Sequence, residues 1–296
     1  MIKIVTAKRQ GTLDHRRWIT LLSELKCREY TIPLNRPKIM GILNVTPDSF
    51  SDAGQFLDLG RALEHAHRMA EEGADILDIG GASTRPGAEP VSIEVELQRV
   101  LPVIQRLIHT IKIPISIDTY QPEVAKICLQ EGVHMVNDVT GLRNPAMREV
   151  VAEFQVPAVI MHMLGEPKTM QKNPYYENVI EDIKKFLGEQ VRQAKSEGIE
   201  QVIVDPGIGF GKTLHHNLEI IRNLKAFKSL DCPLLLGTSR KTFIGKITGV
   251  ENPQDRLEGT IVTNIIGIMN GADIIRVHDV KACKRAIQVY EAIFFP

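Results

Sequence analysis

The sequence predicts an α/β protein that folds as a (β/α)8 barrel, a TIM barrel, with a short N-terminal extension. From Pro37 onward, eight short apolar runs are each followed by a polar turn and then by an amphipathic stretch. Several amphipathic stretches end beside a glycine, a common helix stop, as at Gly73, Gly132 and Gly198. The alternative, an open doubly wound sheet, normally has five or six strands and a glycine-rich first turn. Eight runs and a polar first turn favour the barrel, which usually takes about 250 residues.

The chain divides into an extension, residues 1–36, and the barrel, residues 37–296. Within the extension, apolar residues at helical spacing from Leu13 to Leu25 predict an amphipathic helix, and Glu29 to Leu34 predicts an edge strand. We expect this segment to cap the bottom of the barrel. It carries no pattern that indicates chemistry.

Strands and helices of the barrel are expected in strict alternation. The predicted strands are Lys38–Leu43, Asp75–Ile79, Ile113–Ile117, Val133–Val136, Pro157–Met161, Gln201–Val204, Cys232–Leu236 and Asp273–Val277. The predicted helices are Leu57–Glu72, Ile93–Thr110, Pro122–Glu131, Pro145–Phe154, Tyr175–Glu197, Leu214–Ser229, Pro253–Asn270 and Lys281–Phe294. The helix Pro253–Asn270 is apolar enough for a subunit interface, although core packing alone produces the same pattern.

Composition indicates a soluble enzyme-sized protein. Apolar residues make up 43% of the chain, and 36 basic residues balance 36 acidic ones. A neutral chain lacks the electrostatic footprint of a nucleic-acid or membrane-surface partner, so neither is expected. The four cysteines form no CxxC pair, which favours buried thiols in a reducing compartment over a zinc or disulfide framework. With no signal-peptide core in Met1–Gln10 and no apolar stretch of about 20 residues, a cytoplasmic location is expected.

Polar residues follow every predicted strand, at the end where the strands of a barrel share one pocket. In strand order they are Asn44, then Gly80–Gly87, Asp118-Thr119-Tyr120, Asn137-Asp138, His162-Met163, Asp205–Lys212, Thr238–Lys241 and Arg276–Asp279. Solvated loops alone would not place charged or amide residues so regularly. The pattern therefore predicts one functional site built from all eight strand ends.

The first loop, from Asn44 to Gly54, is rich in oxygen donors, among them Asp48 and Asp52. Such donors suit Mg²⁺ bound together with a phosphorylated substrate. For one isolated loop, a solvated polar turn is the simpler interpretation. The recurrence of polar strand ends along the chain outweighs it.

The remaining strand ends differ in chemistry. Asp118, Asn137 and Asp205 can accept from and donate to a flat nitrogen heterocycle. Cationic groups suited to a phosphate or diphosphate come from Arg85, Lys241, Arg276 and His278. Asn44 can then ligate a Mg²⁺ that bridges the phosphate oxygens. The residues alone thus predict a site for a heterocycle carrying a diphosphate.

Two motifs fail as nucleotide or metal sites. Gly207–Thr213 looks like a phosphate-binding loop, but Pro206 stands where that pattern requires glycine, so a tight turn with Phe210 at the pocket mouth is expected. His215-His216 has no partner ligand at the right spacing and is expected to be solvated. His162, between two methionines, can be either a core residue or a ligand.

Five segments resemble the signature segments of the dihydropteroate synthase family, in the family's order. They are Asn44–Asp52, Ser83–Gly87, Asp205–Lys212, Ser239–Lys241 and Arg276–Asp279. The resemblance implies a cytoplasmic, usually dimeric barrel transferase of folate biosynthesis. Such an enzyme joins 4-aminobenzoate to 6-hydroxymethyl-7,8-dihydropterin diphosphate, giving 7,8-dihydropteroate and diphosphate, and sulfonamides compete with 4-aminobenzoate.

The resemblance also assigns residues to each substrate. The pterin would contact Asp118, Asn137, Asp205 and Lys241, whereas the residues alone had put Lys241 on the phosphate. The diphosphate would be held by Asn44, Thr84, Arg276 and His278, with Asn44 as the protein ligand to Mg²⁺. The groups framing 4-aminobenzoate would be Phe210, Arg85, Pro86 and Thr242, with its carboxylate near the start of the helix that Lys241 opens.

The implied reaction is substitution at the exocyclic methylene of the pterin, with diphosphate leaving. The protein's part is then electrostatic and positional, and needs no nucleophilic side chain. The residues predicted to serve catalysis are Asp52, Arg85, Lys241, Arg276 and His278. The loops bearing Asp52 and Arg85 are expected to close over the second substrate.

Departures from the family pattern occur at Ala53, Ala82 and Leu164, where the family commonly has Gly, Glu, and Gln or Arg. Two alternatives compete with the synthase. A methyltetrahydrofolate-binding methyl-transfer domain would not need Arg85, Arg276 and His278. A non-catalytic pterin-binding paralogue would be expected to have lost the first two loops, and both are present.

Overall fold

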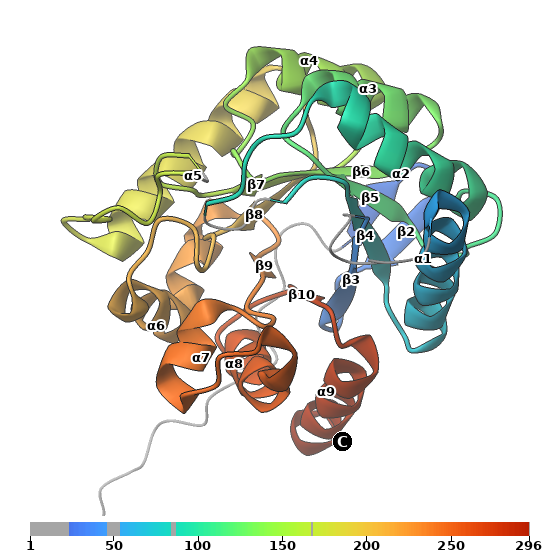
Figure 1. The fold of residues 1–296 in the computed structure, drawn as a ribbon. Helices are drawn as coiled ribbons and strands as arrows, with labels where there is room; N and C mark the ends of the chain where they lie inside the picture. Colours follow the sequence, from blue (N-terminus) through green and yellow to red (C-terminus); the bar gives the residue numbers. More distant parts are fainter. Residues whose placement is uncertain (1–23, 46–53, 84–86, 167, 296) are drawn as a thin grey trace, which may run out of the picture.

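The computed structural model describes residues 24–45, 54–83, 87–166 and 168–295, and it confirms the predicted barrel (Figure 1). Eight parallel strands pair in the order β8-β7-β6-β5-β4-β3-β10-β9. A parallel bridge between Val204 and Leu234 joins β8 to the segment leading into β9, so the sheet closes on itself. The strands are β3 (Lys38–Asn44), β4 (Ile76–Gly80), β5 (Ile115–Asp118), β6 (Met135–Asp138), β7 (Ala158–Met161), β8 (Val202–Asp205), β9 (Leu235–Leu236) and β10 (Ile274–Val277).

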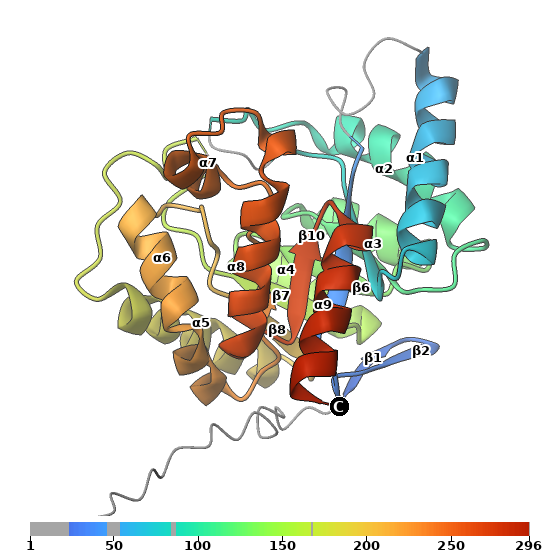
Figure 2. The same cartoon turned by 90° about the horizontal axis from the view of Figure 1, so that it is seen from below.

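Helices surround the barrel as an outer wall, which both views show (Figures 1 and 2). The helices are α1 (Gly54–Glu71), α2 (Ile93–Leu107), α3 (Pro122–Gln130), α4 (Pro145–Phe154), α5 (Val179–Ser196), α6 (Leu214–Arg222), α7 (Thr242–Thr248), α8 (Leu257–Met269) and α9 (Val280–Phe294). None of the helices in the described residues is long and apolar enough to cross a membrane.

Three helical segments differ from the prediction. The helix predicted over Leu214–Ser229 ends at Arg222 and continues as a 3-10 helix, Leu224–Leu230. The segment predicted as Pro253–Asn270 divides into a short 3-10 turn, Pro253–Asp255, and α8. Between them lies α7, which is absent from the eight predicted ranges but begins after its N-cap Lys241, where the sequence predicts that a helix opens.

A two-stranded hairpin lies at the amino end of the barrel. It consists of β1 (Glu24–Cys27) and β2 (Tyr30–Pro33), which pair antiparallel with each other and with no barrel strand. The strand predicted over Glu29–Leu34 is therefore a hairpin strand, not a barrel edge. The helix predicted over residues 13–25 lies outside the described residues except for Glu24 and Leu25, which belong to β1.

The two faces of each barrel strand pack differently. Side chains that face the helices form the large outer core, which includes Leu77 and Ile79 of β4. Alternate side chains face the barrel interior, because successive residues of a strand point to opposite faces. Near the strands' amino ends this inner layer is apolar; it consists of Met40, Ile76, Met135, Val159, Ile203, Leu235 and Ile274. It packs against Leu25, Cys27, Ile32 and Leu34 of the hairpin and the residue after it.

Candidate active site

At the carboxyl ends of the strands, the interior side chains change from apolar to charged. In β10, Ile274 belongs to the apolar layer and Arg276 follows two residues later. The Arg276 guanidinium donates through Nε to Asp78 Oδ2 and through Nη2 to Asp118 Oδ2, both at 2.6 Å. Asn137 Nδ2 donates to the same Asp78 oxygen at 2.9 Å. Residues from four strands thus form one hydrogen-bonded network.

Asp78 is the member of this network that the sequence analysis missed. It lies in the middle of β4 between Leu77 and Ile79, and its side chain is fully buried. The available signal was its position two residues after Ile76, which puts both side chains on the interior face. An ionisable residue on the interior face of a barrel strand belongs with the site, even when its neighbours in sequence are apolar.

Within this network, two buried carboxylate oxygens accept no hydrogen bond from any described residue: Oδ1 of Asp78 and Oδ1 of Asp118. Buried polar atoms are normally paired, and an unpaired acceptor is costly to keep in an interior. Both carboxylates belong to the Arg276 network. The arrangement can therefore accept N–H groups from a bound molecule.

Asp205 and Lys241 also lie close to Arg276. A side-chain carbon placed on Gly237 would lie 3.9 Å from Lys241 Nζ, 3.9 Å from Arg276 Cβ and 4.0 Å from Asp205 Oδ2. These three groups thus converge around one glycine, where an added methyl group would narrow the space between them. Asp205 Oδ1 is held by the backbone N–H of Gly207 at 2.7 Å.

Burial shifts the pKa values of two of these groups toward neutral pH. It raises the pKa of Asp118 from 3.8 to about 7, although the Arg276 guanidinium opposes the shift. It lowers the pKa of Lys241 from 10.5 to about 8, with the Asp205 carboxylate opposing. Burial also raises the pKa of Asp205, against the effect of Lys241. Perturbed titratable groups gathered in one pocket are typical of a functional site.

The Lys241 ammonium lies on the side of the loop after β8. Its Nζ donates to the carbonyl of Ile208 and stands 4.7 Å from the centre of the Phe210 ring. Phe210 in turn packs against a small apolar cluster that contains Met163 and Met170. Lys241 and Phe210, which the resemblance assigned to different substrates, are therefore neighbours.

The glycine-rich loop after β8 is a tight turn packed against the loop after β7. Gly207 and Gly211 have positive φ angles of 69° and 63°. A side-chain carbon on Gly207 would come within 1.9 Å of the His162 carbonyl oxygen, so only glycine fits. At Gly211 it would meet Leu164, one of the departures from the family pattern, at 2.7 Å.

His162 is a buried core residue in this structure. Its Nδ1 lies 3.0 Å from the ammonium of Lys212, which also donates to the carbonyl of Phe210 at 2.9 Å. The His162 ring packs edge-on against Phe186. Burial lowers the pKa of His162 to about 2 and that of Lys212 well below its usual value. Together they fasten the loop after β7 to the loop after β8, which carries Phe210.

Asn44 lies at the rim of the network. A side-chain carbon on Gly80 would be 3.8 Å from Asn44 Oδ1 and 3.6 Å from Asp118 Oδ2, so these two oxygens flank one point. The described residues contain no group of three or more His, Cys, Asp or Glu side chains arranged to hold a metal. The Asn44 amide oxygen is of a donor type that Mg²⁺ accepts when its other ligands come from a bound phosphate and water.

The last two strand ends are joined by side-chain contacts. Ser239 Oγ lies 3.0 Å from His278 Nδ1 and accepts from the His278 backbone N–H at 3.2 Å. Arg240 binds the Asp279 carboxylate with two hydrogen bonds, of 3.0 and 2.6 Å. The loops after β9 and β10, which carry Lys241 and His278, are thus held in fixed relation.

Several predicted site residues fall elsewhere. Asp52, Thr84, Arg85 and Pro86 lie outside the described residues. Thr242 is exposed as the first residue of α7, a helix of only seven residues. Ala82, by contrast, is described and half-buried.

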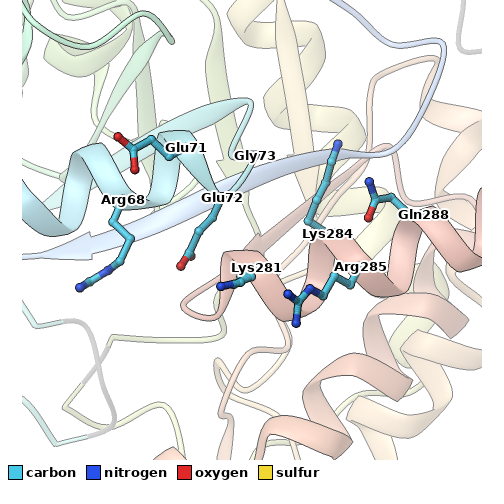
Figure 3. A pocket seen from close by; sticks show the side chains of 8 residues that line it. All are labelled: Arg68, Glu71, Glu72, Gly73, Lys281, Lys284, Arg285 and Gln288. Atoms are coloured by element: carbon cyan, nitrogen blue, oxygen red, sulfur yellow. The ribbon is translucent and has the colours of Figure 1, made fainter.

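A separate groove of about 570 Å³ lies on the outer wall, between the end of α1 and α9 (Figure 3). Its lining is charged and contains none of the predicted site residues. It consists of Arg68, Glu71, Glu72, Gly73, Lys281, Lys284, Arg285 and Gln288. The described part of the predicted site lies instead at the barrel's carboxyl end.

Comparison with known proteins identifies the relatives of this chain. Residues 40–278 match the pterin binding enzyme family. Dihydropteroate synthase of Escherichia coli (strain K12) is 45% identical over 264 residues, covering 88% of this chain and 93% of that protein. The structure of Xanthomonas albilineans dihydropteroate synthase with 4-aminobenzoic acid superposes with a TM-score of 0.88 at 42% identity, covering 93% of this chain and 99% of that one. The same enzyme in complex with 7,8-dihydropteroate gives 0.85 at 40% identity, covering 92% and 99%.

Proposed function

The chain belongs to the dihydropteroate synthases, pterin-binding transferases of folate synthesis, and from this premise we propose how its residues divide the work. The heterocycle of one substrate binds among Asp118, Asn137 and Asp205, and its diphosphate binds beside Asn44, Arg276 and His278. The amine of 4-aminobenzoate approaches from the side of Phe210. Support comes from the single network that joins Asp118, Asn137 and Arg276 at the barrel's carboxyl end.

The pterin is recognised by Asp118, Asn137, Asp205 and Lys241. The unpartnered Oδ1 of Asp118 accepts an N–H of the ring, and Asp205 provides a second acceptor. Asp118 has to be ionised for this role, and a pKa of about 7 keeps that form available near neutral pH. Lys241, beside Asp205 and Phe210, contacts the pterin. The family resemblance implies this role, whereas the residues alone had put Lys241 on the phosphate.

The diphosphate is held by Arg276, His278, Asn44 and, outside the described residues, Thr84. Arg276 uses Nε and Nη2 for its carboxylate partners, which leaves Nη1 as the donor for a phosphate oxygen among the described groups. Its side chain is 20% exposed, so it reaches the pocket. Mg²⁺, when bound with Asn44 and the substrate, neutralises charge on the phosphate oxygens and favours departure of the diphosphate.

In the reaction, the bond between the pterin methylene carbon and the diphosphate oxygen breaks, and a bond from that carbon to the amine nitrogen of 4-aminobenzoate forms. The amine loses one proton, and the diphosphate carries away the electron pair of the broken bond. The chain's residues orient the two substrates and stabilise the charge that develops on the leaving group. Asp52 and Arg85 are proposed to close the site over 4-aminobenzoate.

The deciding experiment is diphosphate release by the purified protein, with pterin diphosphate and Mg²⁺, with and without 4-aminobenzoate. We expect release to require 4-aminobenzoate and to yield 7,8-dihydropteroate in equal amount. Tight pterin binding without product under any condition would instead favour a non-catalytic pterin-binding paralogue.

The Mg²⁺ proposal has its own test. In the presence of inorganic diphosphate, calorimetry should detect Mg²⁺ binding that Asn44→Ala weakens roughly tenfold or more, since the proposed protein ligand is lost. Without diphosphate, both proteins should bind Mg²⁺ weakly. Equal binding by both proteins with diphosphate would remove Asn44 as the ligand.

A homodimer is proposed through the outer faces of α8 and α9, which lie side by side (Figures 1 and 2). On α8, Val262, Ile266 and Met269 are 54%, 41% and 39% exposed at helical spacing, and on α9 Val289 and Ile293 are 62% and 65% exposed. Exposed apolar side chains at helical spacing on two adjacent helices suit a second copy of the same surface about a two-fold axis. Light scattering should report a dimer that Ile266→Glu converts to monomer, whereas Val95→Glu, an isolated exposed site on α2, leaves it intact.

We also propose a cytoplasmic location. The four cysteines are all buried free thiols, and burial raises the pKa of Cys27 and Cys128 to about 12. Such thiols persist in a reducing compartment. Fractionation of cells with an antibody to the chain tests this directly.

A further inference from the structure

We infer that Asp78 is a positioning residue, which sets the orientation of both the pterin-binding amide and the diphosphate-binding guanidinium. This inference rests on the proposed function, because it uses the roles given to Asn137 and Arg276. The hydrogen bonds on which it is based do not depend on those roles. One oxygen of a fully buried carboxylate accepts from both side chains, at 2.9 and 2.6 Å.

The contact decides which way the Asn137 amide faces. A carboxylate accepts hydrogen bonds and cannot donate, so the amide group that meets Asp78 has to be the NH₂. The Asn137 carbonyl oxygen is then directed away from Asp78. Asn137 therefore offers its carbonyl oxygen and the second N–H to a ligand side by side, the pair that reads an adjacent donor and acceptor on a heterocycle edge. Without Asp78, the amide could turn over and present the reverse pattern.

The contact also fixes the guanidinium. Nε of Arg276 faces Asp78 and Nη2 faces Asp118, so the planar group is held at two of its edges. Its third edge, at Nη1, is thereby aimed without further adjustment. A guanidinium held in advance loses less freedom when the diphosphate binds, and stabilises the departing charge with less reorganisation.

Because Asn137 and Arg276 share one Asp78 oxygen, the two ends of the substrate site are linked through that residue. Removing the carboxylate should weaken recognition of the pterin and of the diphosphate together. A purely structural role would instead lower the folded fraction and leave the kinetic constants of the folded protein unchanged. This difference makes the inference testable.

The variant Asp78→Asn keeps the size of the side chain and removes its charge. We expect the KM for pterin diphosphate to rise roughly 10- to 100-fold and kcat to fall, in proportion to the loss of charge-assisted hydrogen bonds. Affinities for 6-hydroxymethylpterin and for inorganic diphosphate, measured separately, should both fall. The KM for 4-aminobenzoate should change least.

Asp138→Asn is the matched control. Asp138 is equally buried, at the end of β6, but its carboxylate accepts from Thr140 and from the Leu142 backbone. This variant should lose thermal stability and keep the wild-type KM for pterin diphosphate. The contrast separates loss of a buried carboxylate in general from loss of the one that holds Arg276.

A double-mutant cycle with Arg276→Lys completes the test. If Asp78 acts on the diphosphate through Arg276, then Asp78→Asn should change diphosphate affinity less than about twofold in the Arg276→Lys background. Independent, multiplicative effects would overturn the inference, as would unchanged KM values in Asp78→Asn. Should Asp78→Asn fail to fold, Asp78→Ser, which removes the carboxylate and leaves a hydroxyl, carries the same cycle. Wild-type turnover in the same assay reports separately on the proposed function.

Discussion

The two ends of the barrel interior are built from the same strands and have opposite character. At the amino end, the inward side chains are apolar and buried under the hairpin, as with Ile76 and Ile274. At the carboxyl end, two residues later in the same strands, stand Asp78 and Arg276. The change occurs within about 7 Å of strand, since a strand rises about 3.3 Å per residue.

This contrast assigns stability and function to different ends. Burying apolar surface stabilises the fold by about 25 cal/mol per Å². Burying carboxylates and a guanidinium costs solvation free energy that their mutual attraction only partly offsets. The amino end therefore holds the barrel together, and the carboxyl end keeps charged groups in place for a ligand that will complete their hydrogen bonds. Substitutions at matched positions in one strand can test this division.

The largest effect is expected from Ile274→Ala at the amino end of β10. The side chain is fully buried in the inner apolar layer, so its truncation leaves a cavity. We expect the free energy of unfolding to fall by about 2–5 kcal/mol. Urea unfolding measures this loss. The KM values of the protein that remains folded should match the wild type, and a marked rise in KM would mean that the two ends are coupled.

Arg276→Lys, two residues along the same strand, should have the reverse effect. The ammonium keeps a positive charge between Asp78 and Asp118 but cannot reproduce the planar set of donors. We expect kcat to fall roughly 10²-fold, as for the loss of one preorganised donor, while the urea midpoint changes little. Steady-state kinetics alongside urea unfolding make the comparison. A large loss of stability with unchanged kcat would show that Arg276 serves the fold.

The general architecture could be predicted because each element carries a local signal. Helix α4 has the predicted bounds, Pro145–Phe154, since Asn144 caps its start and proline fits its first turn. Strand β9 is shorter than predicted, and Pro233 explains part of this because it cannot donate to a sheet ladder. For helix α7 the sequence predicts only the start at Lys241 and not the range, since seven residues are too few for a helical period to be evident.

The site was only partly predictable, for a different reason. Residues at strand ends could be found because a barrel brings those ends together. The partners of each residue could not, because they depend on long-range packing: Arg276 and Asp78 are 198 residues apart in the chain. Asp78 was missed because its strand was treated as one apolar run, although its interior-facing position was readable from the alternation of the strand.

Asp118→Asn should change how the stability of the protein depends on pH, because it removes a buried carboxyl group from the charged end. The folded pKa of Asp118 is about 7 and its ordinary value is 3.8, so the native state binds more protons between these values. Wild-type stability therefore falls as pH rises from about 4 to 7. The variant lacks this titration, so its stability relative to wild type should rise over the same range, on the order of 2 kcal/mol. Its pterin affinity should fall.

Thermal unfolding of Asp118→Asn and wild type at pH 5 and pH 8 measures this change in relative stability. In the wild type, kcat/KM should rise as pH approaches 7, when Asp118 ionises, and decline above about 8, when Lys241 loses its proton. Asp118→Asn should lack the rising limb in its residual activity. An unchanged limb would assign it to another group, with Asp205 the next candidate because burial also raises its pKa.

The smallest effect is expected from Arg36→Gln at the amino end. Arg36 pairs with Asp75 at 2.7 Å, but the arginine side chain is 38% exposed, so water screens the attraction. Such pairs contribute at most about 1 kcal/mol. Asp75 keeps its second role, accepting from the Ile39 backbone N–H at 2.9 Å. Urea unfolding should therefore show less than about 1 kcal/mol of loss, with kcat and KM unchanged. A larger loss would mean that charge, as well as apolar packing, stabilises the amino end. The two ends would then differ mainly in whether a ligand can reach their charged groups.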